Sequence, residues 1–183
     1  MRVVVVGTSG SGKSTFARRL GAAIGAPPLE LDAINWQAGW RDLNTHDPDE
    51  FIRRVALAAK GDAWVADGNY SKARHVLWPR ATRFVWLDYE RGVIMRRVIK
   101  RSFGRALSGR ELWASTGNTE TMARWLDREH PIRWAWDTWA KNRARYAEVF
   151  ARPEYAGVPL DHLRHPREAG PLIARLAAQP LSI

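Results

Sequence analysis

A glycine-rich stretch near the start of the chain has the composition and spacing of a loop that binds phosphate groups. Residues 7–15 read Gly-Thr-Ser-Gly-Ser-Gly-Lys-Ser-Thr and fit the pattern G-x-x-x-x-G-K-S/T. Small residues let the backbone wrap a phosphate, Lys13 can neutralise β- and γ-phosphate charge, and the Ser14 hydroxyl can ligate Mg²⁺. A Gly/Ser-rich turn without this role is the alternative. The complete motif predicts an ATP and Mg²⁺ site made by Gly7, Thr8, Ser9, Gly10, Ser11, Gly12, Lys13, Ser14 and Thr15.

The residues on either side of this stretch supply the elements that such a loop requires. Residues 3–6 are four valines, a β-branched run typical of a buried parallel strand. After the loop, Phe16, Leu20 and Ile24 recur at helical spacing and form one apolar face. A helix that begins near Lys13 adds the positive end of its dipole to the phosphate site.

Hydrophobic runs and turn-forming residues alternate along the whole chain. This alternation predicts a three-layer α/β fold, with a parallel sheet of about five strands between helices. We expect strands at residues 2–6, 29–32, 64–67, 84–88 and 158–163. We expect helices at residues 13–24, 49–60, 71–78, 90–103, 120–128, 132–152 and 166–178. Residues 33–48 are expected to form a polar excursion that contains tryptophan, and residues 106–118 are expected to be irregular. The 183 residues are expected to form a single domain.

Composition narrows the class of protein. No apolar run approaches the roughly 20 residues of a membrane span, and a strand that begins at Arg2 leaves no room for a signal peptide. The chain has no cysteine, which excludes disulfides, thiolate metal sites and a cysteine nucleophile and fits a cytoplasmic protein. A formal net charge of +10 indicates a partner rich in phosphate, either a nucleic acid or a highly charged small substrate.

Two acidic residues are expected at the same edge of the sheet as the loop, because ligands bind beyond the carboxyl ends of parallel strands. Asp67 closes an apolar strand and could hold Mg²⁺ or its waters, or could simply belong to a turn with Gly68. Asp32 could accept a proton from an acceptor hydroxyl, support the metal, or cap a helix.

Arg97 and Arg101 are four residues apart and share one face of a basic helix. Planar guanidinium groups stabilise the charge that spreads over a transferring phosphoryl group. The alternative is a solvated basic face.

These motifs together resemble the P-loop nucleoside and nucleotide kinases, over nearly the whole chain. The resemblance rests on residues 7–15, on Asp67-Gly68, and on Arg97 and Arg101, which follow Asp88 by nine and thirteen residues as in adenylate kinases. Arg143 and Tyr146 match the R-x-x-Y of the helix after the lid. The resemblance implies a lid at about residues 97–143, Arg97 also against the nucleotide base, and Arg101 and Arg143 gripping phosphates.

A bacterial group named topology modulation proteins, or adenylate-kinase-related ATPases, is more closely similar. The matching stretches are Leu31-Asp32 with Trp36 and Trp40, residues 67–71, Thr116-Gly117-Asn118, Trp134-Ala135-Trp136 and residues 142–146.

The acceptor half departs from adenylate kinases. Asp67-Gly68 continues with Asn69-Tyr70-Ser71 in place of Phe-Pro-Arg, and the nearest arginine is Arg74. Asp32 stands where shikimate- and gluconate-type kinases keep an acid near the acceptor hydroxyl. An acceptor-binding excursion is expected at about residues 33–60, and Trp36 or Trp40 could stack on a base or sugar ring or pack a small subcore. The acceptor-side candidates are Asp32, Trp36, Trp40, Arg41, Asn69, Tyr70 and Arg74.

Two classes of function follow. The first is ATP-dependent phosphoryl transfer to a small acceptor, with Lys13, Arg97, Arg101, Arg143 and Asp32 as the catalytic candidates. The resemblance favours a nucleotide or nucleoside acceptor; a non-nucleotide metabolite with a reactive hydroxyl is the alternative, and Asp32 is then the expected base.

The second class is an ATP-binding regulator associated with DNA, which the +10 charge supports. Against it, the basic residues coincide with the lid positions of kinases, and no DNA-reading motif is evident.

Overall fold

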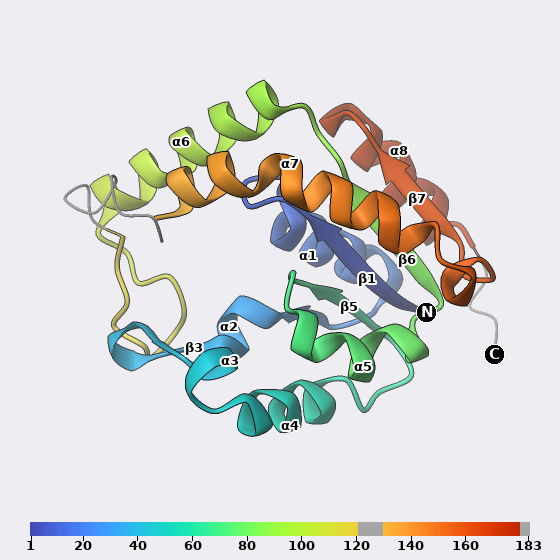
Figure 1. The fold of residues 1–183 in the computed structure, drawn as a ribbon, viewed down its shortest axis with the longest axis horizontal. Coiled ribbons are helices and arrows are strands. Elements are labelled where there is room, and N and C mark those ends of the chain that lie inside the picture. Colours follow the sequence, from blue (N-terminus) through green and yellow to red (C-terminus); the bar gives the residue numbers. More distant parts are fainter. Residues whose placement is uncertain (121–129, 180–183) are drawn as a thin grey trace.

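The computed structural model describes residues 1–120 and 130–179, which are built around a five-stranded sheet (Figure 1). The strand order is β2-β5-β1-β6-β7, and every neighbouring pair is parallel. The strands are β1 (Arg2–Gly7), β2 (Pro28–Glu30), β5 (Trp64–Asp67), β6 (Arg83–Leu87) and β7 (Leu160–Leu163). The expected parallel sheet of about five strands is therefore confirmed.

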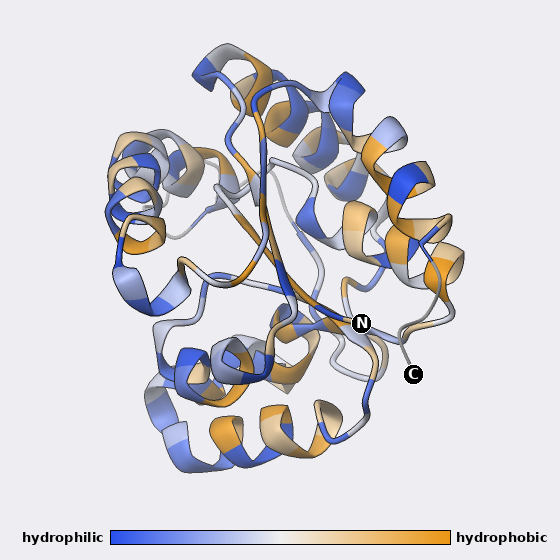
Figure 2. Ribbon diagram, turned by 90° about the vertical axis from the view of Figure 1, so that its right-hand side faces the viewer, coloured by the Kyte–Doolittle hydropathy of each residue, from blue (hydrophilic) through white to orange (hydrophobic). Residues whose placement is uncertain are grey.

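Helices cover both faces of this sheet, because the side chains of β1 alternate between two cores. Val3 and Val5 face a core shared with α1 (Lys13–Ile24), α6 (Arg91–Ser108) and α8 (Ala169–Ala177). Val4 and Val6 face the other core, which α4 (Pro48–Ala58), α5 (Arg74–Leu77) and the C-terminal half of α7 (Pro131–Phe150) cover. Figure 2 shows hydrophobic residues in the central strands and mixed residues in the surrounding helices. These are the three expected layers.

The second strand is shorter than expected. β2 pairs with β5 only from Pro28 to Glu30, and β5 ends at Asp67 opposite Glu30, so the next residue has no strand partner. The chain turns instead into α2 (Leu31–Asn35). Asp32 therefore lies in the first turn of a short helix and does not close the strand.

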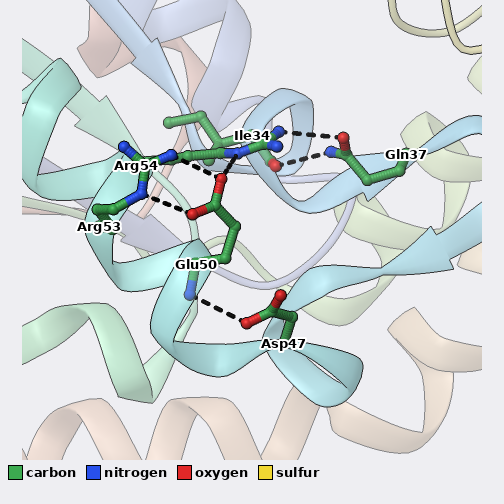
Figure 3. Close-up of polar contacts among 6 residues, drawn as sticks. All are labelled: Ile34, Gln37, Asp47, Glu50, Arg53 and Arg54. Atoms are coloured by element: carbon green, nitrogen blue, oxygen red, sulfur yellow. Dashed lines mark hydrogen bonds and ion pairs between the residues drawn. The ribbon is translucent and has the colours of Figure 1, made fainter.

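Residues 33–48, the expected polar excursion, have regular structure along most of their length. They include most of α2, a hairpin of β3 (Trp36–Gln37) and β4 (Arg41–Asp42), and α3 (Leu43–His46). Figure 3 shows how α4 holds this region: Asp47 caps the helix at the Glu50 N–H, and Glu50 pairs with Arg53 and Arg54. Arg54 also donates to Gln37, and Gln37 donates to the carbonyl of Ile34, so α4 fixes the hairpin against α2.

The helix after β6 is longer than expected. α6 continues past Gly104 to Ser108 and ends at Gly109, whose φ of +56° is the left-handed conformation that glycine adopts easily. The helix expected at residues 120–128 lies outside the described residues except for Glu120. A short turn at Pro166–Glu168 leads into α8. Among residues 1–120 and 130–179, no helix is long and apolar enough to cross a membrane.

Candidate active site

The loop between β1 and α1 has a backbone shape that its glycines make possible. Gly7, Gly10 and Gly12 all have positive φ values, and Gly12 stands immediately before the first residue of α1. A Cβ on Gly7 would lie 2.6 Å from the carbonyl oxygen of Leu87 on the neighbouring strand. The loop thus passes β6 in a way that only glycine permits at position 7.

Lys13 folds back over this loop. Its Nζ donates to the carbonyl oxygens of Gly7 at 2.9 Å and Thr8 at 3.4 Å. Burial lowers the pKa of Lys13, and the nearby Asp32 and Asp67 carboxylates oppose that effect. The ammonium group is therefore close to both acids, at the start of a helix, which is a suitable position for a group that binds phosphate.

Asp67 and Ser14 form the metal-binding candidate. The Ser14 hydroxyl donates to Asp67 Oδ2 at 2.6 Å, and Asp67 Oδ1 is buried with no hydrogen-bond partner among the described residues. Burial raises the pKa of Asp67 to about 6. A hydroxyl and a carboxylate beside a phosphate loop fit Mg²⁺, which takes one or two protein oxygens and completes its shell with phosphates and waters.

Asp32 is held by Tyr70. The Tyr70 hydroxyl donates to Asp32 Oδ1 at 2.7 Å, and the Tyr70 ring packs on Phe51 with 5.0 Å between centroids. The charge of the Asp32 carboxylate acts to raise the pKa of both Lys13 and Arg101, so Asp32 lies within electrostatic range of the loop and of the basic helix. This is the arrangement that a proton acceptor beside a phosphoryl donor requires.

Arg97 and Arg101, two of the three arginines expected to bind phosphates, lie along the loop side of α6. A guanidinium nitrogen of Arg97 is 2.8 Å from where a Cβ on Gly12 would be, so this side chain covers the loop. Burial lowers the pKa of Arg101 to about 10, with the charge of Arg105 contributing. These residues line an open groove of about 450 Å³ made by Arg97, Lys100, Arg101, Gly104, Arg105 and Ser108.

Arg143 is placed differently. Its Nε lies 3.2 Å from Asp88 Oδ2 and its Nη1 lies 3.4 Å from Glu90 Oε1. Asp88 Oδ2 also contacts His162 Nε2 at 2.9 Å. In this conformation Arg143 is held at the end of β6 by two carboxylates, whereas Arg97 lies against the loop.

Of the acceptor-side candidates, Asn69 and Arg74 are engaged elsewhere. The Asn69 side chain bonds to Gly7 of the loop, with Nδ2 donating to the carbonyl at 2.8 Å. The Arg74 guanidinium lies 4.8 Å from the centre of the Trp78 ring, next to Tyr146. Arg41 is exposed on the hairpin. Within this set the structure brings Asp32 into contact with Tyr70, and Trp36 into contact with Trp40 at 5.6 Å between ring centroids.

Trp36 and Trp40 pack with a third tryptophan that the sequence analysis did not single out. Trp113 stacks on Trp36 at 6.3 Å and meets Trp40 edge-on at 6.0 Å. Beside them the buried Asn118 accepts from the Trp40 N–H at 3.0 Å and donates to the Gln37 carbonyl at 2.9 Å. Residues 109–120, the segment drawn in yellow that follows α6 in Figure 1, are thereby attached to the β3–β4 hairpin.

Neither Trp113 nor Asn118 carries a periodic pattern that would have revealed this contact. The sequence shows only a tryptophan and an asparagine in a glycine-containing segment, and such a composition is equally typical of an ordinary turn. Trp36 and Trp40 come from the hairpin and Trp113 from the 109–120 segment. The small subcore, which was one of the two expectations for Trp36 and Trp40, therefore also includes a residue of the 109–120 segment.

The strand order and the loop place the chain among proteins with the P-loop kinase fold. A solved shikimate kinase from Acinetobacter baumannii, in complex with shikimate, is similar in structure, with a TM-score of 0.57 and 18% sequence identity, covering 96% of this chain and 89% of that one. A sugar kinase from a Janibacter species has a TM-score of 0.50 and 21% identity, covering 95% and 90%. An uncharacterised protein from Eubacterium ventriosum has a TM-score of 0.51 and 11% identity, covering 98% and 100%.

This likeness shows the P-loop kinase fold. No model of a known family matches the sequence, and no curated protein does.

Proposed function

We propose that the protein is a kinase that transfers the γ-phosphoryl group of ATP to a hydroxyl group of a small acceptor. The observation that carries this proposal is the carboxylate of Asp32, which Tyr70 holds near Lys13 and Arg101. A hydroxyl acceptor must lose a proton as it attacks phosphorus, and in this proposal Asp32 accepts that proton. Two proteins with the same fold are described as a shikimate kinase and a sugar kinase, which supports a hydroxylated acceptor.

Each loop residue then has a defined task. The backbone of residues 7–15 and the ammonium of Lys13 bind the phosphates, and the guanidinium groups of Arg97 and Arg101 balance the charge on the transferring group. The acceptor oxygen forms a bond to the γ-phosphorus while the bond to the β-phosphate oxygen breaks and ADP leaves. Ser14 and Asp67 would hold Mg²⁺, which neutralises charge on the β- and γ-phosphates when bound.

A nucleotide that accepts the phosphoryl group on its own phosphate is the second candidate, as the overall resemblance to adenylate kinases suggests. Such an acceptor needs a cation on the acceptor side and no base. Arg74, the nearest arginine after Asp67-Gly68 and one of the acceptor-side candidates, packs on Trp78 in this structure. This position favours the hydroxyl acceptor, which includes the hydroxyl of a nucleoside.

The direct test is ATP consumption against a panel of nucleosides, nucleoside monophosphates, sugars and small hydroxy acids, with Lys13→Ala as the blank. With the acceptor that stimulates ADP release, Asp32→Asn should lower kcat by about 100-fold or more, because general base catalysis contributes on that scale. Asp62→Asn, which changes an exposed aspartate in the turn before β5, is the matched control.

The other outcomes point to other functions. A nucleoside monophosphate acceptor combined with normal turnover by Asp32→Asn would replace the hydroxyl proposal with transfer to phosphate. Duplex DNA as the sole stimulant of hydrolysis, with salt-dependent retention on DNA at about 150 mM salt, would replace the kinase with a DNA-associated regulator.

A further inference from the structure

Asn69 lies between the phosphate loop and α7 and makes hydrogen bonds to both. Its Nδ2 donates to the Gly7 carbonyl oxygen at 2.8 Å, and the Gly7 N–H points to its Oδ1 at 3.5 Å. On the other side, the hydroxyl of Tyr146 donates to the same Oδ1 at 2.7 Å. One amide group thus connects residues that are 62 and 77 positions away in the sequence.

The neighbouring cation fixes the direction of these hydrogen bonds. Arg145 Nη2 donates to the Tyr146 hydroxyl oxygen at 3.3 Å, so the proton of that hydroxyl is directed toward Asn69. An amide oxygen that accepts from Tyr146 leaves the amide nitrogen to face Gly7. Tyr146 is 1% exposed, and this burial makes the orientation costly to reverse.

The Gly7 carbonyl has a second donor, which is the ammonium group of Lys13 at 2.9 Å. In a kinase this ammonium must bind the β- and γ-phosphates during the reaction. When Lys13 turns to the phosphates, the Gly7 carbonyl loses one of its two donors, and Asn69 still supplies the other. Since Gly7 also abuts the carbonyl of Leu87, a small displacement at this residue would shift the loop.

We propose that Asn69 and Tyr146 are positioning residues of the nucleotide site. The amide of Asn69 keeps Gly7 in place when Lys13 moves to the phosphates, and Tyr146 fixes that amide from α7. Asn69 therefore acts on the donor side of the reaction, although the sequence analysis assigned it to the acceptor. The inference rests on the proposed function in one respect, which is that a nucleotide phosphate chain binds at residues 7–15.

The test measures nucleotide binding directly, without an acceptor. The full chain and the variants Asn69→Ala, Asn69→Asp, Tyr146→Phe and the double variant Asn69→Ala/Tyr146→Phe are titrated with ADP and with inorganic tripolyphosphate by calorimetry. The thermal midpoint of each unliganded variant is recorded alongside. Tyr155→Phe is the matched control, because the Tyr155 ring packs on Trp78 and Phe84 in the turn after α7.

Loss of the Asn69 amide should weaken both ligands about tenfold, since one hydrogen bond near a charged group is removed. Asn69→Asp should weaken them at least as much, because a carboxylate oxygen then faces the Gly7 carbonyl. Tyr146→Phe should weaken them about threefold, and the double variant should be no weaker than Asn69→Ala, because the hydroxyl acts through the amide. Tyr155→Phe should bind as the wild type does.

Three results would overturn the inference. The first is wild-type affinity for both ligands in Asn69→Ala, with the KM for the acceptor raised instead, which would return Asn69 to the acceptor side. The second is full additivity of Asn69→Ala and Tyr146→Phe. The third is weaker binding that results only from partial unfolding of the variants. In that case Asn69→Asp and Tyr146→Phe would bind both ligands as the wild type does at a temperature where both variants are folded. Failure of the proposed function looks different: the wild type would bind ADP and phosphorylate none of the acceptors.

Discussion

The hydroxyl of Ser14 donates a 2.6 Å hydrogen bond to Asp67, a residue 53 positions later that ends the strand beside β1. The contact joins the first turn of α1 to the carboxyl end of β5. It leaves the other oxygen of the Asp67 carboxylate, Oδ1, buried without a hydrogen-bond partner among the described residues. The Asp67 carboxylate is therefore held in a place where it is poorly solvated.

This arrangement predicts an unusual pH dependence of stability. Burial raises the pKa of Asp67 from an ordinary value of 3.8 to about 6, so the folded protein binds this proton more tightly than the unfolded chain does. Between those two pH values the wild type loses stability relative to Asp67→Asn as the pH rises, and above about pH 6 the difference stays constant. Over this pH range the free energy of unfolding of the wild type should fall by roughly 3 kcal/mol relative to that of Asp67→Asn.

Urea unfolding of the wild type and Asp67→Asn from pH 4 to 8, without nucleotide or Mg²⁺, measures this difference. Asp62→Asn controls for the loss of a charge at an exposed site. A pH-independent difference would show that Asp67 titrates normally. In the same variant, the effect of Mg²⁺ on ADP affinity should largely disappear, because Asp67 is part of the proposed metal site.

The glycines of the loop and of α6 predict opposite effects of the same substitution. Gly7→Ala places a Cβ 2.6 Å from the Leu87 carbonyl at a positive φ, so we expect lost nucleotide binding and a destabilisation of about 1–3 kcal/mol from backbone strain. At Gly104, in the middle of α6, a Cβ would meet nothing within 4 Å. Gly104→Ala should therefore stabilise the protein by about 0.5–1 kcal/mol, as measured by urea unfolding. Equal effects of the two variants would contradict the loop geometry.

Tyr70→Phe removes the hydrogen bond that holds Asp32 and keeps the ring on Phe51. We expect kcat to fall about tenfold with the acceptor identified in the panel, because a bond to a charged group contributes about 1.5–3 kcal/mol and only part of it is felt at the transition state. The affinity for ADP should not change, since the hydroxyl of Tyr70 bonds to Asp32 and its ring packs on Phe51. Steady-state kinetics alongside ADP titration separates the two effects, and a kcat equal to that of the wild type would show that Asp32 needs no support from Tyr70.

Asn118→Ala removes two hydrogen bonds that attach the 109–120 segment to the β3–β4 hairpin. The segment should detach more often, and trypsin should cleave after Arg110 about 30-fold faster, since each of the two bonds contributes about 1 kcal/mol. Mass spectrometry of timed digests measures the rate. Thr119→Ala alters the adjacent exposed residue and should leave the rate of cleavage unchanged. If Asn118→Ala were cleaved as slowly as the wild type, the three tryptophans would hold the segment without the two hydrogen bonds.

The fold was predictable where local pattern and tertiary structure agree. The loop motif, the valine run before it and the apolar face of α1 all belong to one continuous stretch, and each was predicted with nearly correct bounds. Asp32 was misplaced because the length of β2 is set by β5, where pairing ends opposite Asp67. A strand end that depends on a neighbour 37 positions away carries no local signal.

The partners of side chains were harder to predict than the elements that carry them. The sequence named Asn69 and Tyr146 in separate motifs, but their contact depends on how α7 crosses the sheet. In the same way Trp36, Trp40 and Trp113 meet only because the chain after α6 returns to the hairpin. Contacts of this kind arise from tertiary packing, and residue type alone does not predict which side chains will meet.

The groove along α6 has a consequence for the rate at which ligands arrive. Four of the residues that line it, Arg97, Lys100, Arg101 and Arg105, are cationic, and the first of them lies against the phosphate loop. Such a field concentrates polyphosphate anions near the loop before any contact forms, and its reach shrinks from about 30 Å at 0.01 M salt to about 8 Å at 0.15 M. Added salt should therefore slow the capture of a nucleotide far more than it speeds its escape.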